Sequence, residues 1–202
     1  EVDTTYTFAL DLPLIARDGT VLEKSLTRTV VIPRGRPRLG FAQRTGRLGT
    51  HGAFEVDLKV RNVSEATLTV RRLLEEHLPV YLTGVMDHAD VAKLSEELLT
   101  TTLNLTDMQS SKSAPVVIDL DAFMNRTPGV YRLDIEAKGH RWEYDHMLLF
   151  VGDLGLELNQ DQTGVLAWVT DVETAQPVAG AAVRAWTTNH TILAEGVTDA
   201  NG

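Results

Sequence analysis

Cysteine is absent from the 202 residues, which excludes disulfides, zinc–thiolate centres and thiol nucleophiles from this chain. No apolar run approaches the about 18 residues that a membrane-spanning helix needs. Basic residues are fewer than acidic ones: 19 Lys and Arg and 28 Asp and Glu give a formal net charge of −9. A negative surface repels phosphate backbones, so nucleic acid is not expected as a partner. The start Glu1-Val2-Asp3 is not that of a signal peptide, as expected of a cytosolic protein or an internal piece of a longer one.

Alternation of apolar and polar residues predicts β-strands along most of the chain. Two such runs in residues 5–33 flank the turn pair Asp18-Gly19. Pro33 and Pro37 then interrupt the pattern, since proline cannot donate to a ladder. This break carries a short basic patch, Arg34, Arg36 and Arg38. We expect a solvated linker there, and the alternative is an interaction surface.

Further strand signals follow the linker at intervals of eight to twelve residues. Residues 54–61 alternate strictly, with apolar Phe54, Val56, Leu58 and Val60 against charged neighbours, and residues 66–72 suit an antiparallel partner. Later runs begin near residues 116, 130, 142, 154, 164, 182 and 191, and Gly, Pro and Asn turns separate most of them. This spacing predicts antiparallel β-sandwiches of the immunoglobulin or fibronectin-III kind and disfavours a parallel sheet.

Residues 87–104 depart from this pattern. Asp87 suits a helix N-cap, and Val91, Leu94 and Leu98 follow at helical spacing. We therefore predict one amphipathic helix near 87–104, laid over a sheet edge or face, and a polar loop over residues 107–113.

Strand counting divides the chain into three parts. A sandwich of about seven strands takes roughly 100 residues, which residues 37–152 supply. Residues 1–36 form the closing hairpin of a preceding domain or an N-terminal extension, and residues 153–202 form the start of another sandwich. The fold class predicted is all-β, with tandem sandwiches and one short inserted helix.

Acidic residues give two weak site candidates, for which structural interpretations are favoured. Asp119 and Asp121 lie two apart, far short of the six to eight oxygens that calcium takes, and a solvated loop is expected. Glu143 and Asp145 alternate with aromatic residues on a strand, so we expect a charged outer face in preference to an acid–base pair. Two histidines, His140 and His146, flank this strand segment.

Other chemistry-bearing residues also have simpler interpretations. The segment 199–202, Asp-Ala-Asn-Gly, has a weak likeness to a calcium loop and is predicted to be a hairpin turn. A serine cluster, Ser110, Ser111 and Ser113, lacks a glycine elbow and is not expected to supply a nucleophile. The three tryptophans, Trp142, Trp168 and Trp186, are assigned to strands and to a core or interface. We expect no catalytic, cofactor-binding or metal site, and no enzyme activity.

The tail of the chain resembles the macroglobulin-type (MG) domains of bacterial α2-macroglobulins. The resemblance lies in the order of Val165-Leu166, Trp168-Val169, residues 177–181, residues 193–196 and the closing residues 198–202. Segments 37–41, 60–63, 68–72, 128–131 and 150–156 resemble the preceding MG domain and its connection to the next. The resemblance covers residues 37–202.

The resemblance implies a structural segment of a broad-range endopeptidase inhibitor, which traps proteases after cleavage of a bait segment. It implies a periplasmic location, with an inner-membrane lipid anchor upstream, and as partners the neighbouring MG domains and, through the full-length protein, target proteases. The thioester of many members needs cysteine and is absent from this segment. Two alternatives stay open: a secreted adhesion or glycan-binding sandwich, and an accessory domain of a carbohydrate-active enzyme.

Overall fold

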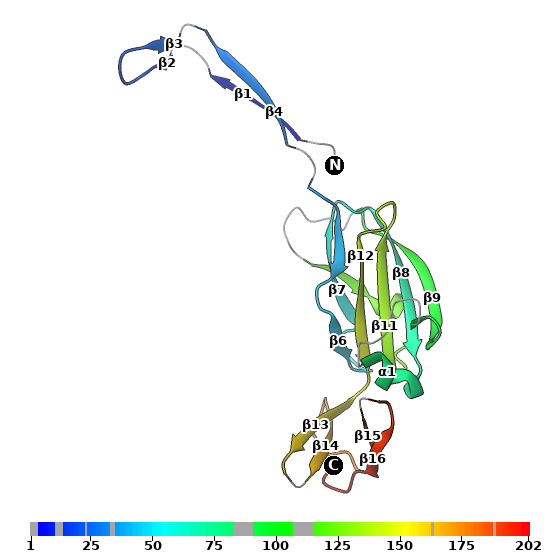
Figure 1. Cartoon of the computed structure of the whole chain (residues 1–202). Coiled ribbons are helices and arrows are strands. Elements are labelled where there is room, and N and C mark those ends of the chain that lie inside the picture. Colours follow the sequence, from blue (N-terminus) through cyan, green and yellow to red (C-terminus); the bar gives the residue numbers. More distant parts are fainter. Residues whose placement is uncertain are drawn as a thin grey trace.

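The computed structural model describes residues 4–10, 14–22, 24–32, 35–82, 91–106, 115–162, 164–187 and 189–202. Figure 1 shows three bodies in a row: an N-terminal hairpin, a central sandwich and a C-terminal unit. The hairpin pairs β1 (Thr4–Leu10) with β4 (Leu26–Ile32), and the short strands β2 (Leu14–Ile15) and β3 (Val21–Leu22) form its tip. Asp18 and Gly19 lie in the turn between the short strands, where Asp18 Oδ1 accepts from Thr20 N at 3.0 Å.

The central sandwich has two sheets, and their strands are set by the period-two pattern of the sequence. One sheet has the order β10 (Val116–Asp119), β7 (Glu55–Arg61), β5 (Arg38–Phe41). The other has the order β6 (Thr45–Leu48), β12 (Tyr144–Val151), β11 (Gly129–Ala137), β8 (Glu65–Leu73), β9 (Ser95–Asn104). All neighbouring strands are antiparallel except β12 and β6, which are parallel.

The inward-facing residues of both sheets form one core. Phe54, Leu58, Leu68, Leu133 and Leu149 are each at most 1% exposed. Tyr131 is also buried, and its hydroxyl donates to Thr127 O at 2.7 Å, so its polar end is satisfied. The predicted all-β class is confirmed, with tandem antiparallel sheets and, within the ranges that the structure describes, one short α-helix, α1 (Leu78–Leu82). No helix in the described ranges is long and apolar enough to cross a membrane.

The helix predicted near 87–104 is wrong over residues 95–104, which form strand β9 at the edge of the five-stranded sheet. Thr100, Thr101 and Thr102 are β-branched and favour a strand, and Leu103 is buried while its neighbours are more exposed. Residues 87–90 lie outside the described residues. The short helix lies earlier, in the crossover between β8 and β9, directly after the 3-10 turn η1 (Glu75–His77).

The C-terminal unit consists of two hairpins, β13 (Leu154–Gln160) with β14 (Val165–Asp171) and β15 (Ala182–Trp186) with β16 (Ile192–Val197). Residues 199–202 form the predicted turn. It lies against β14, because Val169 N donates to Gly202 O at 2.8 Å and Trp168 Nε1 donates to Asn201 O at 2.8 Å. Gly202 has a φ of +84°, and a Cβ there would lie 2.5 Å from Val169 O, so the turn requires glycine.

Candidate functional site

The acidic residues that the sequence offered as ligands are engaged in local structure. Asp119 Oδ1 accepts from Asp121 N at 2.9 Å, at the start of the 3-10 turn η2 (Leu120–Ala122). Asp121 in turn accepts from Arg126 Nε at 2.8 Å, and this hydrogen bond lowers the pKa of the Asp121 carboxyl. Asp119 and Asp121 therefore stabilise the local turn. The described residues contain no cluster of three or more His, Asp or Glu suited to a metal ion.

Glu143 and Asp145 do not form a solvated outer face; their carboxylates bind the backbone of β5, the edge strand of the opposite sheet. Glu143 Oε2 accepts from Leu39 N at 3.2 Å, and Asp145 Oδ2 accepts from Phe41 N at 2.9 Å. The two carboxylates thus replace a neighbouring strand at the edge of β5. Gly40 makes this approach possible, because a Cβ there would lie 2.8 Å from Asp145 Oδ2. The alternation at 141–146 contained this pair, but nothing in it indicated the target of the carboxylates.

Trp142 is not a core residue: it is 75% exposed, in the turn between β11 and β12. The ring of His140 lies edge-on to it, with centroids 5.4 Å apart. Trp168, at 44%, is also exposed, and Trp186 is partly buried. Ser110, Ser111 and Ser113 lie outside the described residues.

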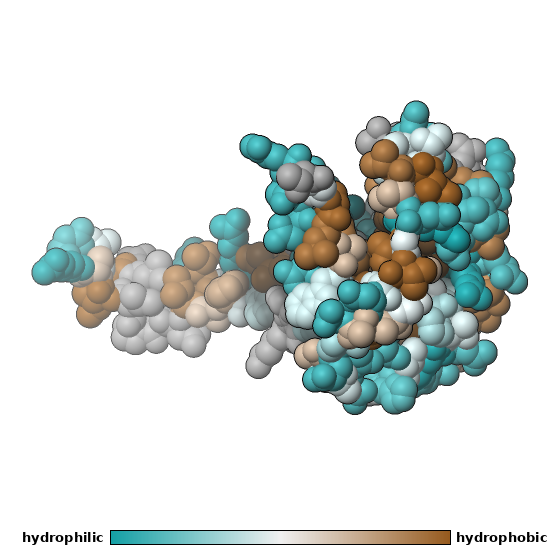
Figure 2. All heavy atoms as spheres, turned by 90° about the horizontal axis from the view of Figure 1, so that it is seen from below, coloured by the Kyte–Doolittle hydropathy of each residue, from teal (hydrophilic) through white to brown (hydrophobic). Residues whose placement is uncertain are grey.

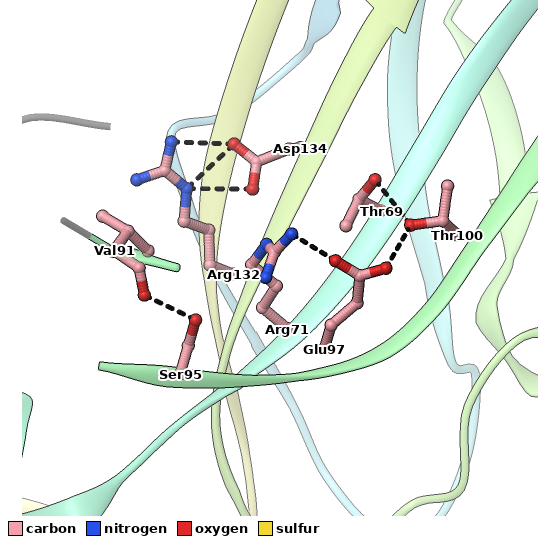
Figure 3. Close-up of polar contacts among 8 residues, drawn as sticks. All are labelled: Thr69, Arg71, Val91, Ser95, Glu97, Thr100, Arg132 and Asp134. Carbon is pink, nitrogen blue, oxygen red and sulfur yellow. Dashed lines mark hydrogen bonds and ion pairs between the residues drawn. The ribbon is translucent and has the colours of Figure 1, made fainter. Parts of the chain in front are cut away.

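The most developed polar site lies on the outer face of the five-stranded sheet and was missed by the sequence reasoning. Arg132 of β11 is only 4% exposed, and its guanidinium forms an ion pair with Asp134 at 2.7 Å (Figure 3). The same guanidinium donates to the Tyr144 hydroxyl at 2.7 Å, and that hydroxyl donates to Asp134 Oδ1 at 2.7 Å. We call Arg132, Asp134 and Tyr144 the outer-face triad. Each charge therefore has a partner on the same surface.

The triad supports the crossover between β8 and β9. The guanidinium of Arg132 lies 6.0 Å from the centroid of the Tyr81 ring of α1, within reach of a cation–π interaction. A second small core lies beneath the crossover, where Leu73, Val91 and Leu148 are buried and Leu78, Tyr81 and Val130 pack against them. The crossover thus covers apolar surface that the sheet would otherwise expose.

A second set of contacts orders strand β9 beside the triad. Arg71 forms an ion pair with Glu97, and Thr100 Oγ1 donates to Glu97 Oε1 at 2.9 Å while lying 3.1 Å from Thr69 Oγ1 (Figure 3). Ser95 Oγ donates to Val91 O at 2.6 Å and joins the end of the crossover to the strand. The triad and these contacts draw their residues from β8, β9, β11 and β12 and from Val91 before β9, which explains why no local motif predicted the site.

Burial and the neighbouring carboxylate change the acidity of the triad. Desolvation, together with the hydrogen bond to Asp134, raises the pKa of Tyr144 to about 12. The pKa of Arg132 is also raised: burial opposes this, and the hydrogen bond and charge of Asp134 outweigh it. Arg132 and Tyr144 therefore keep their protons at ordinary pH, in contrast to a general acid or base, whose pKa lies near the working pH.

The central sandwich joins the C-terminal unit through a short connection centred on Asp153. Thr50 N donates to Asp153 Oδ1 at 2.7 Å, and the Thr50 hydroxyl donates to Oδ2. These bonds lower the pKa of the Asp153 carboxyl. On the other side of the connection, Val172 N donates to Asp153 O at 2.8 Å. One residue thus contacts both bodies.

Two arginines add contacts across this joint. Arg47 of β6 donates to Leu154 O, at the start of β13. Arg184 of β15 forms an ion pair with Glu75 of η1 at 3.1 Å, so the crossover touches the C-terminal unit as well. The joint is therefore tied both at the connection and at the crossover.

Both end bodies expose apolar residues on one face. In the C-terminal unit a groove of about 340 Å³ separates the two hairpins, and its apolar lining includes Leu156, Leu158, Val165, Val183 and Val197. Figure 2 looks at this end and shows apolar side chains gathered at the surface. In the N-terminal hairpin, the pairing of Tyr6 with Val30 and of Leu10 with Leu26 builds a similar exposed apolar face, with Phe8 62% exposed between them. Faces of this kind mark surfaces that bury themselves against other elements.

Comparisons with known proteins agree with this arrangement. Residues 151–202 match the family model of the bacterial alpha-2-macroglobulin MG3 domain. The structure superposes, with a TM-score of 0.76 and 16% identity, on native alpha-2-macroglobulin from Escherichia coli spanning domains MG0-NIE-MG1, covering 100% of this chain and 67% of that one. A fragment of the same protein spanning NIE-MG1 superposes with a TM-score of 0.65 and 15% identity, over 83% of this chain and 85% of that one.

The chain spans only a small share of longer solved structures that it resembles. The native conformation of E. coli alpha-2-macroglobulin gives a TM-score of 0.65 at 16% identity, with all of this chain covered and 13% of that chain. No curated protein sequence matches the chain. The family model carries the number MG3 and the solved fragments end in MG1, so the comparisons agree on the class of domain and differ in its number.

Proposed function

We propose that this chain, which resembles the MG domains of bacterial α2-macroglobulins in its tail sequence and its fold, is a framework segment of a protease-trapping protein of that kind. In this role the central sandwich holds its two neighbours at a defined spacing and angle. The longer protein supplies the bait segment and encloses the protease. As part of the same proposal, that protein resides in the periplasm, held to the inner membrane by an upstream lipid.

The open apolar groove of the C-terminal unit is the observation that carries the proposal. Two hairpins expose leucines and valines toward one another across about 340 Å³, as the halves of a sandwich do before further strands cover them. The joint at Asp153 holds this unit against the central sandwich. A small-ligand pocket is also mostly apolar, but it encloses its ligand and adds a few precisely placed polar groups, whereas this groove lies open between two hairpins.

An extended version of the chain tests this role. We expect residues of the longer protein that follow Gly202 to cover the groove, so that the extended chain binds less of the apolar dye ANS than residues 1–202 do. We also expect slower amide exchange in β13 to β16 of the extended chain, because burial protects their hydrogen bonds. Equal dye binding and equal exchange in both chains would show that the groove is not an unfinished core, and the framework proposal would then fail.

A further inference from the structure

The end of the central sandwich nearest the N-terminal hairpin presents an exposed tryptophan on a rigid turn. Trp142 is 75% exposed, although burying an indole is among the largest apolar gains a protein can make. The turn is held by three backbone hydrogen bonds: His140 N to Ala137 O at 3.1 Å, Glu143 N to His140 O at 2.8 Å and Ala137 N to Glu143 O at 2.9 Å. The edge-on ring of His140 orients the indole further. A rigid, exposed aromatic side chain loses little conformational entropy when it binds.

The surface beside Trp142 is hollow and polar. A depression of about 770 Å³ lies against the turn, lined by Thr67, Glu136, Lys138 and Arg141 among others. The Nδ1 atom of His140 is buried and has no hydrogen-bond partner among the described residues. Space and the exposed guanidinium of Arg141 are therefore available beside the indole.

Cations surround this end of a strongly acidic chain. Arg38 and Arg61 are paired across β5 and β7, and Arg36 lies beside them, since Arg61 Nε donates to its carbonyl at 3.2 Å. The backbone N–H of Leu39, directly after Arg38, donates to Glu143, directly after Trp142. The arginines and the indole are therefore parts of one end surface. Arg36, Arg38, Arg61 and Arg141 are all exposed.

The nearby acidic groups are mostly engaged. Glu65 forms an ion pair with Lys138 at 2.6 Å, and Glu143 and Asp145 accept from the backbone of β5. The exposed arginines Arg36, Arg38, Arg61 and Arg141 outnumber the carboxylates of Glu136, Glu143 and Asp145, which keep their charge, so the end surface is cationic in a protein whose formal net charge is −9. An acidic partner is attracted to such a patch, whereas the rest of the surface repels it.

We propose that this surface, made of Trp142, Arg141, Arg36, Arg38 and Arg61, docks an acidic polypeptide segment that carries an apolar side chain for the indole and the adjoining depression. Tryptophan and arginine are the residues most enriched among those that dominate protein interfaces. A neutral glycan fits less well, because the surface offers the one ring of Trp142 for stacking and its arginines favour a negatively charged partner. The inference stands independently of the framework role, since it depends only on the central sandwich.

Fluorescence anisotropy tests the proposal with the whole chain and a fluorescein-labelled glutamate-rich peptide that carries a central leucine pair. We expect binding with a Kd on the order of 10–100 μM at low salt, weakening as salt screens the arginines. Trp142→Ala should weaken binding at least about tenfold. Arg141→Glu should also weaken it and flatten the salt dependence. Both residues are exposed, so the thermal midpoint of the chain should stay unchanged.

Matched controls lie on the N-terminal hairpin, away from the proposed surface. Phe8→Ala removes an exposed aromatic ring and Arg28→Glu makes the same charge reversal, and neither should change binding. Absence of binding up to about 1 mM protein, titrated against a fixed low concentration of labelled peptide, would overturn the proposal. So would equal loss in the controls, or binding of a lysine-rich peptide as tight as the acidic one. Binding of an alginate or a neutral oligosaccharide that depends on Trp142, in the absence of peptide binding, would assign the surface to glycans instead.

Discussion

Removing the buried cation of the outer-face triad should destabilise the central sandwich far more than removing an exposed one. In Arg132→Met the apolar part of the side chain is kept and the charge is lost, so Asp134, whose side chain is 18% exposed, keeps only the Tyr144 hydroxyl as a partner in the triad. Breaking a fully buried pair costs about 3–5 kcal/mol, and the partial exposure of Asp134 lowers our expectation to about 2–3 kcal/mol. Loss of the contact with the Tyr81 ring adds roughly 0.5 kcal/mol.

Arg71→Met is the matched control, because it makes the same chemical change on the same face. Arg71 is 21% exposed and its partner Glu97 is 46% exposed, so the loss should stay below about 1 kcal/mol. In the double variant Arg132→Met with Asp134→Leu no buried charge is left unpaired, and most of the lost stability should return.

Native-state hydrogen exchange at the amides of β8 and β11 measures these differences in the free energy of unfolding within the central sandwich. A cost below 1 kcal/mol for Arg132→Met would refute the reasoning. A double variant as unstable as the single one would also refute it, since the cost could then not come from the unpaired carboxylate.

Three further results are expected. Absorbance of tyrosinate during an alkaline titration should show Tyr144 ionising near pH 12, and this late step should vanish in Tyr144→Phe. Because the pKa of Tyr144 is raised in the folded state, the stability that Tyr144 contributes is present below about pH 10 and is lost as pH rises toward 12. Equal resistance to alkali in both proteins would contradict the triad geometry. Gly40→Ala should cost about 1–3 kcal/mol in urea unfolding, because the added Cβ displaces Asp145 and leaves an edge amide unpaired, whereas Gly164→Ala, where a Cβ meets nothing, serves as its control. Asp153→Asn should broaden the distance distribution between spin labels placed on β11 and β14. Since the pKa of the Asp153 carboxyl is lowered, the wild-type joint should loosen only as pH falls below about 3.8. An unchanged distribution in the variant would show that other contacts set the joint.

Strand content was predictable because the period-two pattern is strong where one face of a strand is buried. Phe54, Val56 and Leu58 alternate with charged residues, and their side chains enter the core as expected. The turn at 199–202 was predictable from its own residues, since Gly202 adopts the positive φ that the turn needs; that it joins two strands of a hairpin stays a prediction.

Strand β9 shows where the pattern misled. Val91, Leu94 and Leu98 have helical spacing, yet Leu98 is 43% exposed and the strand pairs along β8 with a bulge between Val70 and Arg71. Pairing with an open sheet edge is a tertiary effect that a local window does not contain.

The candidate sites were the least predictable part. Arg132, Asp134 and Tyr144 look like ordinary charged and aromatic residues of two strands, and their function as a triad depends on the register between β11 and β12. Glu143 and Asp145 likewise bond to amides 104 residues away in sequence. The sequence predicts which side chains of such a strand point away from the core. Their hydrogen-bond and ion-pair partners depend on how the strands and the two sheets assemble.

The proposal that this chain is framework in a protease trap, whose bait segment lies outside residues 1–202, is tested most directly by protease inhibition measured side by side. Residues 1–202 and the proposed longer protein are each incubated with several endopeptidases, and hydrolysis of a large protein substrate and of a small peptide substrate is followed. The account predicts that residues 1–202 inhibit neither reaction, while the longer protein protects the large substrate, spares the small one and changes its gel mobility after cleavage. Inhibition by residues 1–202 alone, or failure of the longer protein to protect the large substrate, would contradict it.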